Sequence, residues 1–129
     1  MLCLPVRVES AGQARRALDH DLTARGIEGG ARDDLLLIVS ELVTNAIRHG
    51  QPLGCDGTVH VGWTVGDRGV AIEVTDGGEG LPKASASGTE HESGRGLALV
   101  DALSTRWGVA HDATPATTVW ACVAHPPVG

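Results

Sequence analysis

The sequence predicts an α+β fold, a two-layer α/β sandwich in which helices cover one face of a mostly antiparallel mixed sheet. The chain has 129 residues, 42% apolar and 20% charged, as expected for one globular domain over residues 1–129. Hydrophobic periodicity gives the order strand, helix, helix, strand, strand, loop, helix, strand, strand. Most of these strands come in consecutive pairs joined by short turns, which favours antiparallel pairing.

The N-terminal part of the chain contains one strand and two helices. Residues 4–9 alternate between apolar and polar side chains and include Pro5, which predicts a short edge strand. Ser10 is expected to cap a helix over residues 11–25, and a second, stronger helix is expected over residues 31–49. Each helix stops at a glycine, the residue that most readily ends a helix.

The rest of the chain is predicted to form two hairpins separated by a long loop and a short helix. The β-rich segments 58–65 and 69–75 are joined by a Gly-Asp-Arg-Gly turn. The stretch 76–96 is rich in glycine and serine and has no apolar run, so we expect a functional loop there. The remaining expected elements are a helix over 97–103 and strands over 105–111 and 117–124.

Charge and composition argue against several classes of function. The net charge is −6, from 10 basic and 16 acidic residues, which disfavours a nucleic-acid backbone or an anionic membrane as partner. There are three tryptophans but no Phe or Tyr, which disfavours stacking of single-stranded bases. The three cysteines are widely spaced without a CxxC pair, so neither a metal site nor a disulfide framework is expected. Without a long apolar run or a signal-peptide layout, we expect a soluble, cytoplasmic protein.

The second helix presents two different faces. At about 100° per residue, Glu41, Asn45 and Arg48 fall on one stripe, and Ile38 shares that face. A carboxylate, a carboxamide and a guanidinium on one stripe suit a proton acceptor, a ligand of metal or phosphate, and a charge partner. The structural alternative is a solvated face held by intrahelical pairs. The stripe expected to be buried consists of Leu35, Leu36, Val39, Leu42, Val43, Ala46 and Ile47.

A second candidate motif follows the predicted strand over residues 69–75. Asp76 is followed by glycines that include Gly78 and Gly80, which suits a site where the backbone approaches a ligand closely. Because a carboxylate only accepts hydrogen bonds, Asp76 can bind an exocyclic amine such as that of adenine. The alternative is a glycine-rich turn that Asp76 caps.

A third motif, Gly94-Arg95-Gly96-Leu97, stands at the start of the last predicted helix. Glycines at this place let a phosphate approach free N–H groups and the positive end of the helix dipole. The alternative is a helix that simply begins after a glycine. No βαβ unit surrounds the motif, which argues against a dinucleotide-binding fold.

In this order, the three motifs together are more specific than any one of them. The segments ELVTNAIRHG (41–50), VTDGGEGLP (74–82) and GRGL (94–97) resemble the motifs of the GHKL ATPase family. This family includes histidine kinases, gyrase-type ATPases and anti-sigma-factor kinases, and the chain is most similar to the stand-alone branch of anti-sigma-factor serine/threonine-protein kinases. The sequence has no long dimerisation helix with a phosphoacceptor histidine, so a self-contained sensor histidine kinase is not expected.

The resemblance implies the Bergerat fold, the α/β sandwich of this family, and a role for each motif residue. Asn45 would bind the Mg²⁺ that bridges the ATP phosphates, and Glu41 would act as general base. Asp76 would accept a hydrogen bond from the adenine amino group, while Gly78 and Gly80 would let the backbone pass close to the base.

The phosphate side of the site is implied in the same way. Gly94 and Gly96 would flank the phosphates, and residues 83–93 would form a lid over ATP. Lys83 and Arg95 are the basic residues that this lid offers to the phosphates.

Three further residues take roles from their positions in the motifs. His49 closes the motif helix, where we expect it to interact favourably with the helix dipole; a role in phosphate binding is the alternative. Leu97 belongs to the glycine motif at the last helix. Thr118 matches the threonine that supports the adenine aspartate, although Ala116-Thr117 stands where the family usually has a glycine.

The function implied by the resemblance is that of an ATP-binding regulator of the anti-sigma type. It would transfer the γ-phosphoryl group of Mg-ATP to a serine of an antagonist protein, and its partners would be a sigma factor and that antagonist. The alternative is a non-catalytic module in which ATP gates a protein contact. The sequence leaves the oligomeric state open, a homodimer included.

Overall fold

The computed structural model describes residues 1–49, 58–76, 97–111 and 116–125, and it confirms the predicted α+β sandwich. The N-terminal elements are β1 (Leu2–Pro5), α1 (Glu9–Ala24) and α2 (Gly29–His49). The β2–β3 hairpin and the C-terminal elements follow as β2 (Thr58–Val65), β3 (Gly69–Asp76), α4 (Leu97–Leu103), β4 (Arg106–His111) and β5 (Thr117–Ala124).

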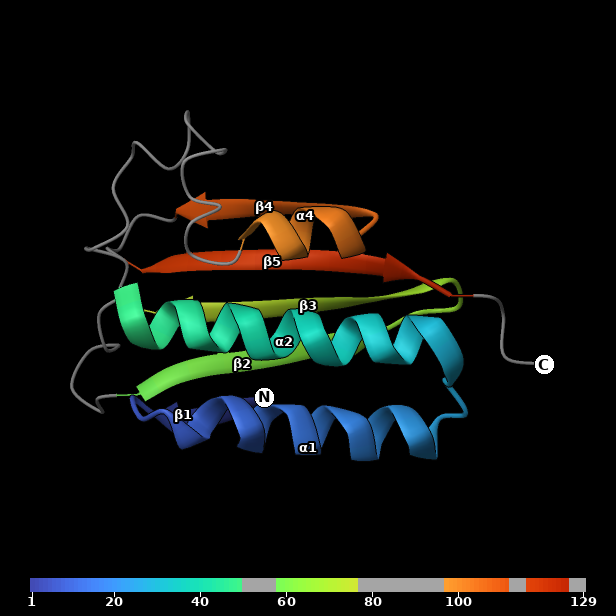
Figure 1. Cartoon of the computed structure of the whole chain (residues 1–129), viewed down its shortest axis with the longest axis horizontal. Helices are drawn as coiled ribbons and strands as arrows, with labels where there is room; N and C mark the ends of the chain where they lie inside the picture. Colours follow the sequence, from blue (N-terminus) through green and yellow to red (C-terminus); the bar gives the residue numbers. More distant parts are fainter. Residues whose placement is uncertain (50–57, 77–96, 112–115, 126–129) are drawn as a thin grey trace.

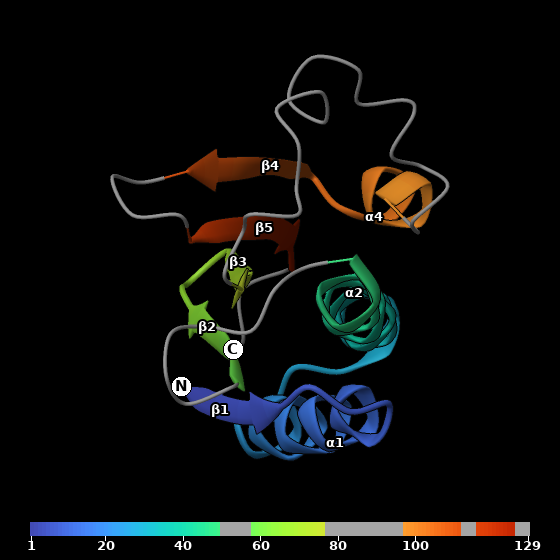
Figure 2. The same ribbon diagram turned by 90° about the vertical axis from the view of Figure 1, so that its left-hand side faces the viewer.

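The strands form one sheet in the order β1-β2-β3-β5-β4, and helices α1, α2 and α4 lie on one face of it (Figures 1 and 2). All four pairings between the described strands are antiparallel. The expectation of a mixed sheet was wrong in this detail. Strands β3 and β4 point the same way, but β5 returns between them and pairs with each, so the two parallel strands are never neighbours.

The first turn of α1 differs from the prediction. Strand β1 ends at Pro5, and α1 begins at Glu9, with Val8 as its N-cap residue and without a side-chain cap. Ser10 is therefore not the cap. Its side chain is buried, and its hydroxyl donates a hydrogen bond of 2.5 Å to the carbonyl oxygen of Pro5. The serine thus ties the helix to the end of the strand, because it lies inside the first helical turn and its hydroxyl reaches back to β1.

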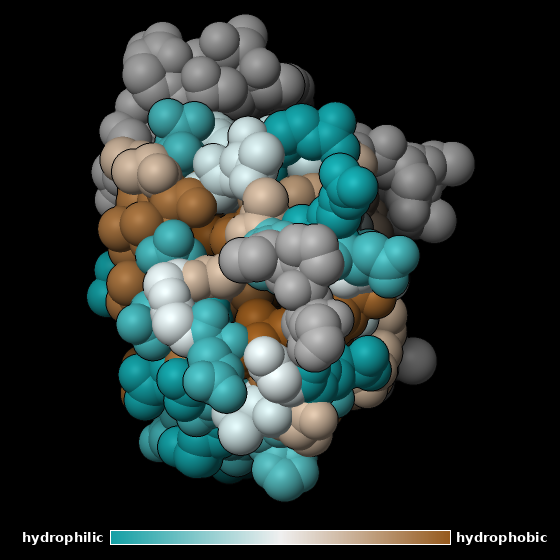
Figure 3. Space-filling view, turned by 90° about the vertical axis from the view of Figure 1, so that its right-hand side faces the viewer, coloured by the Kyte–Doolittle hydropathy of each residue, from teal (hydrophilic) through white to brown (hydrophobic). Residues whose placement is uncertain are grey.

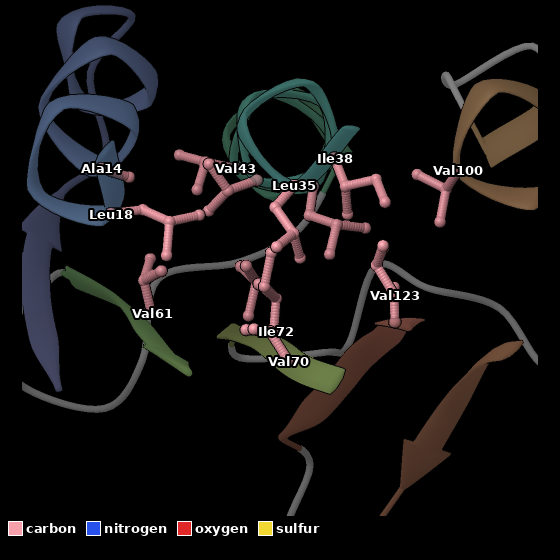
Figure 4. Packing of buried hydrophobic residues seen from close by; sticks show 14 of the residues in the cluster. Ala14, Leu18, Leu35, Ile38, Val43, Val61, Val70, Ile72, Val100 and Val123 are labelled. Carbon is pink, nitrogen blue, oxygen red and sulfur yellow. The ribbon is translucent and has the colours of Figure 1, made fainter. Parts of the chain in front are cut away.

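The core lies between the helices and the covered face of the sheet (Figure 4). The predicted stripe of α2 is confirmed, since Leu36 and Ile47 are partly buried against the core and the other members are buried. Ile38 is also fully buried, although the sequence placed it on the polar face of α2. Figure 4 gives the reason: Ile38 points to the side of α2 on which Val100 of α4 lies. Burial of one such side chain contributes roughly 1.5–3 kcal/mol to stability.

Strand β3 alternates strictly between the two faces of the sheet. Val70, Ile72 and Val74 are buried on the helix-covered face, and Asp76 continues this row at the end of the strand. Glu73 points to the other, helix-free face and is exposed. The carboxylate of Asp76 is thus the polar end of an otherwise apolar row.

Among the described helices, none is both long enough and apolar enough to span a membrane.

Candidate functional site

Three elements meet at one end of the molecule, on the left in Figure 1. Helix α2 and strand β3 run toward this end and terminate there, strand β5 begins there, and the N-terminus of helix α4 is directed toward the same end. The described parts of all three sequence motifs are therefore at the same end of the sandwich. In the chain they are separated by tens of residues, and the fold alone brings them together.

Asp76 is the best-defined polar group of this end. It is the last residue of β3, it lies on the helix-covered face, and only 3% of its surface is exposed. A buried carboxylate is costly unless hydrogen-bond donors surround it. A carboxylate so placed is suited to accept a hydrogen bond from a ligand that enters between the sheet and the helices.

The strand register contradicts the role predicted for Thr118. Asp76 lies opposite Thr117 of β5, and Thr118 lies opposite Thr75. The hydroxyls of Thr75 and Thr118 are 2.7 Å apart and hydrogen-bonded to each other. Because successive side chains of a strand point to opposite faces, Thr118 lies on the helix-free face and cannot support Asp76. Thr117, which is fully buried, occupies the position that the sequence assigned to its neighbour.

Glu41 and Asn45 lie one helical turn apart on α2 and are each half-buried. They share the flank of the helix on which Ile38 points toward the side of α4. Among the described residues, neither side chain makes a hydrogen bond or an ion pair. The intrahelical pairs of the structural alternative are therefore not formed, and both side chains remain available to a ligand.

Arg48 lies on the same helix but is exposed to solvent. It forms no ion pair with any residue that the structure describes. Its predicted role as a charge partner of this stripe therefore has no support within the described part of the chain.

The remaining predicted residues fall into three groups. Leu97 is the first residue of α4 and is buried in the core, so its side chain packs against apolar neighbours. His49 is the last residue of α2, and its side chain is outside the description. The residues that lie outside the described ranges altogether are Gly78, Gly80, Lys83, Gly94, Arg95 and Gly96.

The donor set is compatible with Mg²⁺ held jointly by the protein and a ligand. Within the described ranges, no three His, Cys, Asp or Glu residues come together as a metal cage. Mg²⁺ is commonly held by one or two protein oxygens together with water and substrate phosphates. The half-buried carboxamide of Asn45, whose oxygen is unengaged by described residues, fits such a single-ligand site.

A pocket of about 500 Å³ lies at the opposite end of the molecule, at the turn between β2 and β3. Arg25, Arg68 and His125 are among its lining residues, and none of the candidate residues is. Figure 3 shows that end, with hydrophilic and hydrophobic residues interspersed on its surface. This pocket is therefore separate from the candidate site.

Comparison with known proteins places the chain in a family. Residues 4–123 match the model of the histidine kinase-like ATPase domain. The serine-protein kinase RsbW of Oceanobacillus iheyensis is 30% identical over 112 residues, which cover 78% of this chain and 71% of that protein. The anti-sigma F factor of Bacillus velezensis is 42% identical over 48 residues, which cover 37% of this chain and 33% of that protein.

The fold has a close counterpart among solved structures. The structure of the RsbU and RsbW domains of Rv1364c from Mycobacterium tuberculosis superposes with a TM-score of 0.68 at 23% identity. The match covers 98% of this chain and 32% of that one, and at this identity it shows the fold alone. The family match over nearly the whole chain is the decisive finding: the chain belongs to the histidine kinase-like ATPase domain family, which is the GHKL family that the three motifs resemble.

Proposed function

We propose that this protein is an anti-sigma-type regulator that binds Mg-ATP at the end described above and transfers its γ-phosphoryl group to a serine of an antagonist protein. The observation that carries the proposal is the placement of Glu41 and Asn45. They lie on the flank of α2 that is directed toward the side of α4, at the same end of the sandwich as the buried Asp76. In this arrangement Asp76 offers a hydrogen-bond acceptor for adenine, Asn45 a metal ligand and Glu41 a proton acceptor.

Asp76 and Thr117 would hold the adenine. The Asp76 carboxylate accepts a hydrogen bond from the exocyclic amino group, and Thr117 lies opposite it on the same face. Because guanine has a carbonyl oxygen where adenine has this amine, a carboxylate there repels guanine nucleotides. Gly78 and Gly80, which follow Asp76 in the sequence, would let the backbone pass close to the base.

Asn45 would hold the Mg²⁺ through its carboxamide oxygen. The metal, when bound, neutralises charge on the phosphate oxygens. The polypeptide on the phosphate side would consist of residues 83–93 as the lid, with Gly94 and Gly96 flanking the phosphates and with Lys83 and Arg95 as basic ligands. These assignments rest on the motif resemblance.

Glu41 would act as the general base of the transfer. Its carboxylate takes the proton of the attacking serine hydroxyl, whose oxygen forms a bond to the γ-phosphorus. The bond between that phosphorus and the bridging oxygen to the β-phosphate breaks, and ADP leaves with the bridging oxygen. Phosphoryl transfer depends mainly on positioning and charge neutralisation, so one base, one metal ligand and a phosphate-binding segment are a sufficient set.

The proposed partners follow from the names of the similar proteins, a serine-protein kinase RsbW and an anti-sigma F factor. We infer that the partners are a sigma factor and an antagonist protein that carries the acceptor serine. The cytoplasmic location that the sequence predicts agrees with such partners and stays a prediction.

A transfer assay tests the proposal directly. The protein is incubated with Mg-ATP labelled in the γ-phosphate and with antagonist candidates from the same genome, and phosphoserine is sought by mass spectrometry. Labelled phosphoserine on one candidate supports the kinase. Tight binding of ATP with an ATP-dependent protein contact, but with no labelled product, would favour the non-catalytic module instead.

A further inference from the structure

Helix α4 has only seven residues, and its C-terminal end is fastened to the sheet. The amide and hydroxyl groups of Ser104 each donate to the carbonyl oxygen of Val100, at 2.9 and 2.6 Å. The next residue, Thr105, donates its N–H to the carbonyl oxygen of Cys122 on β5 at 2.7 Å. The helix therefore leaves the sheet from a fixed point and extends toward the end that carries the candidate site.

A second attachment lies on the body of the helix. The indole N–H of Trp107, on edge strand β4, donates to the Oδ1 atom of Asp101 at 2.7 Å. Trp107 pairs with the buried Ala121 in the strand register, so its side chain lies on the helix-covered face of the sheet. The bond therefore runs from the edge of the sheet up to α4.

So short a helix depends on such contacts. Helices below about twelve residues are marginal by themselves, and tertiary contacts hold them. On one side, Leu97 and Val100 are buried in the core, and in Figure 4 Val100 lies on the side of α2 to which Ile38 points. On the other side, Asp101 is held by Trp107. The two sets of contacts together define how close α4 lies to the α2 flank that carries Glu41 and Asn45.

From this geometry we infer that Asp101 and Trp107 are positioning residues: their hydrogen bond holds α4 against α2 and so sets the wall of the nucleotide site beside Glu41 and Asn45. The inference rests on the proposed function, because it takes the site to bind Mg-ATP. A protein whose α4 leaves this position is incompetent for binding, so the apparent affinity falls with the fraction of molecules in which α4 is in place.

The chain contains its own matched control at the other edge of the helical layer. The indole N–H of Trp63 on β2 donates to the Oδ2 atom of Asp21 on α1 at 2.8 Å, the same chemical pair at nearly the same length. Helix α1 is separated from α4 by α2 and carries none of the candidate residues (Figure 2). Loss of this bond therefore removes an equivalent contact without touching the wall of the site.

The experiment measures the Kd of Mg-ATP by calorimetry for the full chain and four variants. W107F keeps the aromatic ring and removes the indole N–H, and D101A removes the acceptor. Each should raise the Kd by more than twofold. About tenfold is the upper limit, because loss of one partly exposed hydrogen bond to a carboxylate cannot lower the fraction of molecules with α4 in place by a larger factor. D101N keeps an acceptor oxygen and should stay within about twofold of the natural chain. W63F should lower the thermal midpoint but leave the Kd unchanged.

A combined variant and a second readout complete the design. The double variant W107F/D101A should bind Mg-ATP no more weakly than either single variant, because both substitutions remove the same hydrogen bond. Hydrogen exchange without nucleotide should speed up in α4 for W107F and in α1 for W63F.

The outcomes separate the inference from the function on which it rests. If the natural chain binds no Mg-ATP, the proposed function and the inference both fail. If it binds Mg-ATP and W107F and D101A bind equally well, or W63F weakens binding as much as W107F, only the positioning role is overturned. Asp101 is exposed, so D101A keeps the test valid even if W107F does not fold.

Discussion

Asp76 and Thr117 face each other across strands β3 and β5 on the helix-covered side of the sheet, with 3% and 0% of their surfaces exposed. The next pair in the register, Thr75 and Thr118, lies on the other side and closes a hydrogen bond between its two hydroxyls. Thr117 therefore lies beside the carboxylate proposed to bind adenine, whereas Thr118, its neighbour in the chain, links two strands on the other face.

The two threonines should therefore respond differently to removal of the hydroxyl. Thr117→Val should weaken ATP binding by about tenfold, equivalent to roughly 1.4 kcal/mol, because it removes a buried polar group beside Asp76. Thr118→Val should leave the ATP affinity unchanged and lower the free energy of unfolding by roughly 0.5–1.5 kcal/mol through loss of its bond to Thr75. Calorimetry and urea unfolding measure the two effects. If Thr118→Val weakened ATP binding and Thr117→Val did not, Thr118 and not Thr117 would be the threonine of the adenine site.

Asp76→Asn should weaken nucleotide binding by roughly 10- to 150-fold while the fold persists. The amide can present its NH₂ group to the adenine amine, and loss of a charge-assisted hydrogen bond costs roughly 1.5–3 kcal/mol. For the same reason the natural chain should bind ATP and reject GTP. Circular dichroism checks the fold and calorimetry the affinity. Equal affinities for ATP and GTP would remove Asp76 from the adenine site.

Glu41→Gln and Asn45→Ala should separate catalysis from binding. Glutamine keeps the size of the side chain but cannot take a proton at neutral pH, so Mg-ATP should bind within a few-fold while phosphoryl transfer falls by roughly 10²–10⁴. Alanine at position 45 removes the metal ligand, so the Mg²⁺-dependent part of the affinity should also be lost. Rates of labelled transfer and Kd values with and without Mg²⁺ distinguish the two. Undiminished transfer in Glu41→Gln would reject the base.

Asp21 should make the stability of the fold depend on pH in acid. The hydrogen bond from Trp63, helped by Arg25 and opposed by desolvation, lowers the pKa of Asp21 below its ordinary value of 3.8. A carboxylate with a lowered pKa adds stability above its unfolded-state pKa, and this stability is lost as the pH falls through the folded-state pKa.

Trp63→Phe removes the largest cause of this shift. The pKa of Asp21 should therefore rise in the variant, and its deficit in the free energy of unfolding should be present at neutral pH and shrink in acid below pH 3.8. NMR titration of the carboxyl group and urea unfolding along the same pH series provide the measurements. In a pair of chains that both carry Asp21→Asn, the pH-dependent part of the difference should disappear. A difference that stays constant down to the lowest pH would show that the indole acts only through packing.

Local patterns in the sequence were sufficient for most of the elements. Strand β2 (Thr58–Val65) and helix α4 (Leu97–Leu103) have the predicted bounds, because alternation and glycine boundaries are properties of short segments. The apolar stripe of α2 is also local, since a helix repeats its faces every few residues. The family was recognised in the same way, from three short motifs in a fixed order, and the match over residues 4–123 confirms it.

The tryptophans make contacts that local sequence patterns do not predict. Trp63, Trp107 and Trp120 lie in segments that the sequence predicted as strands, and the structure confirms these strands. The sequence could not show that Trp63 and Trp107 each give their N–H to an aspartate of a helix. The residues of the first pair are 42 positions apart. Even for the second pair, 6 positions apart, the bond depends on how α4 folds back over β4.

The amino-acid sequence alone determined the order of the elements, the buried stripe of α2 and the family, because each depends only on patterns within segments of a few to twenty residues. Tertiary structure decided which threonine faces Asp76, that Ile38 is buried on the side of α2 where α4 lies, and that β5 inserts between β3 and β4 to make every described pairing antiparallel. The physical reason is that strand register and helix docking are set by contacts between residues far apart in the chain. A shift of one residue in the register moves a side chain to the opposite face of the sheet, and no local pattern around Thr117 and Thr118 distinguishes the two alternatives.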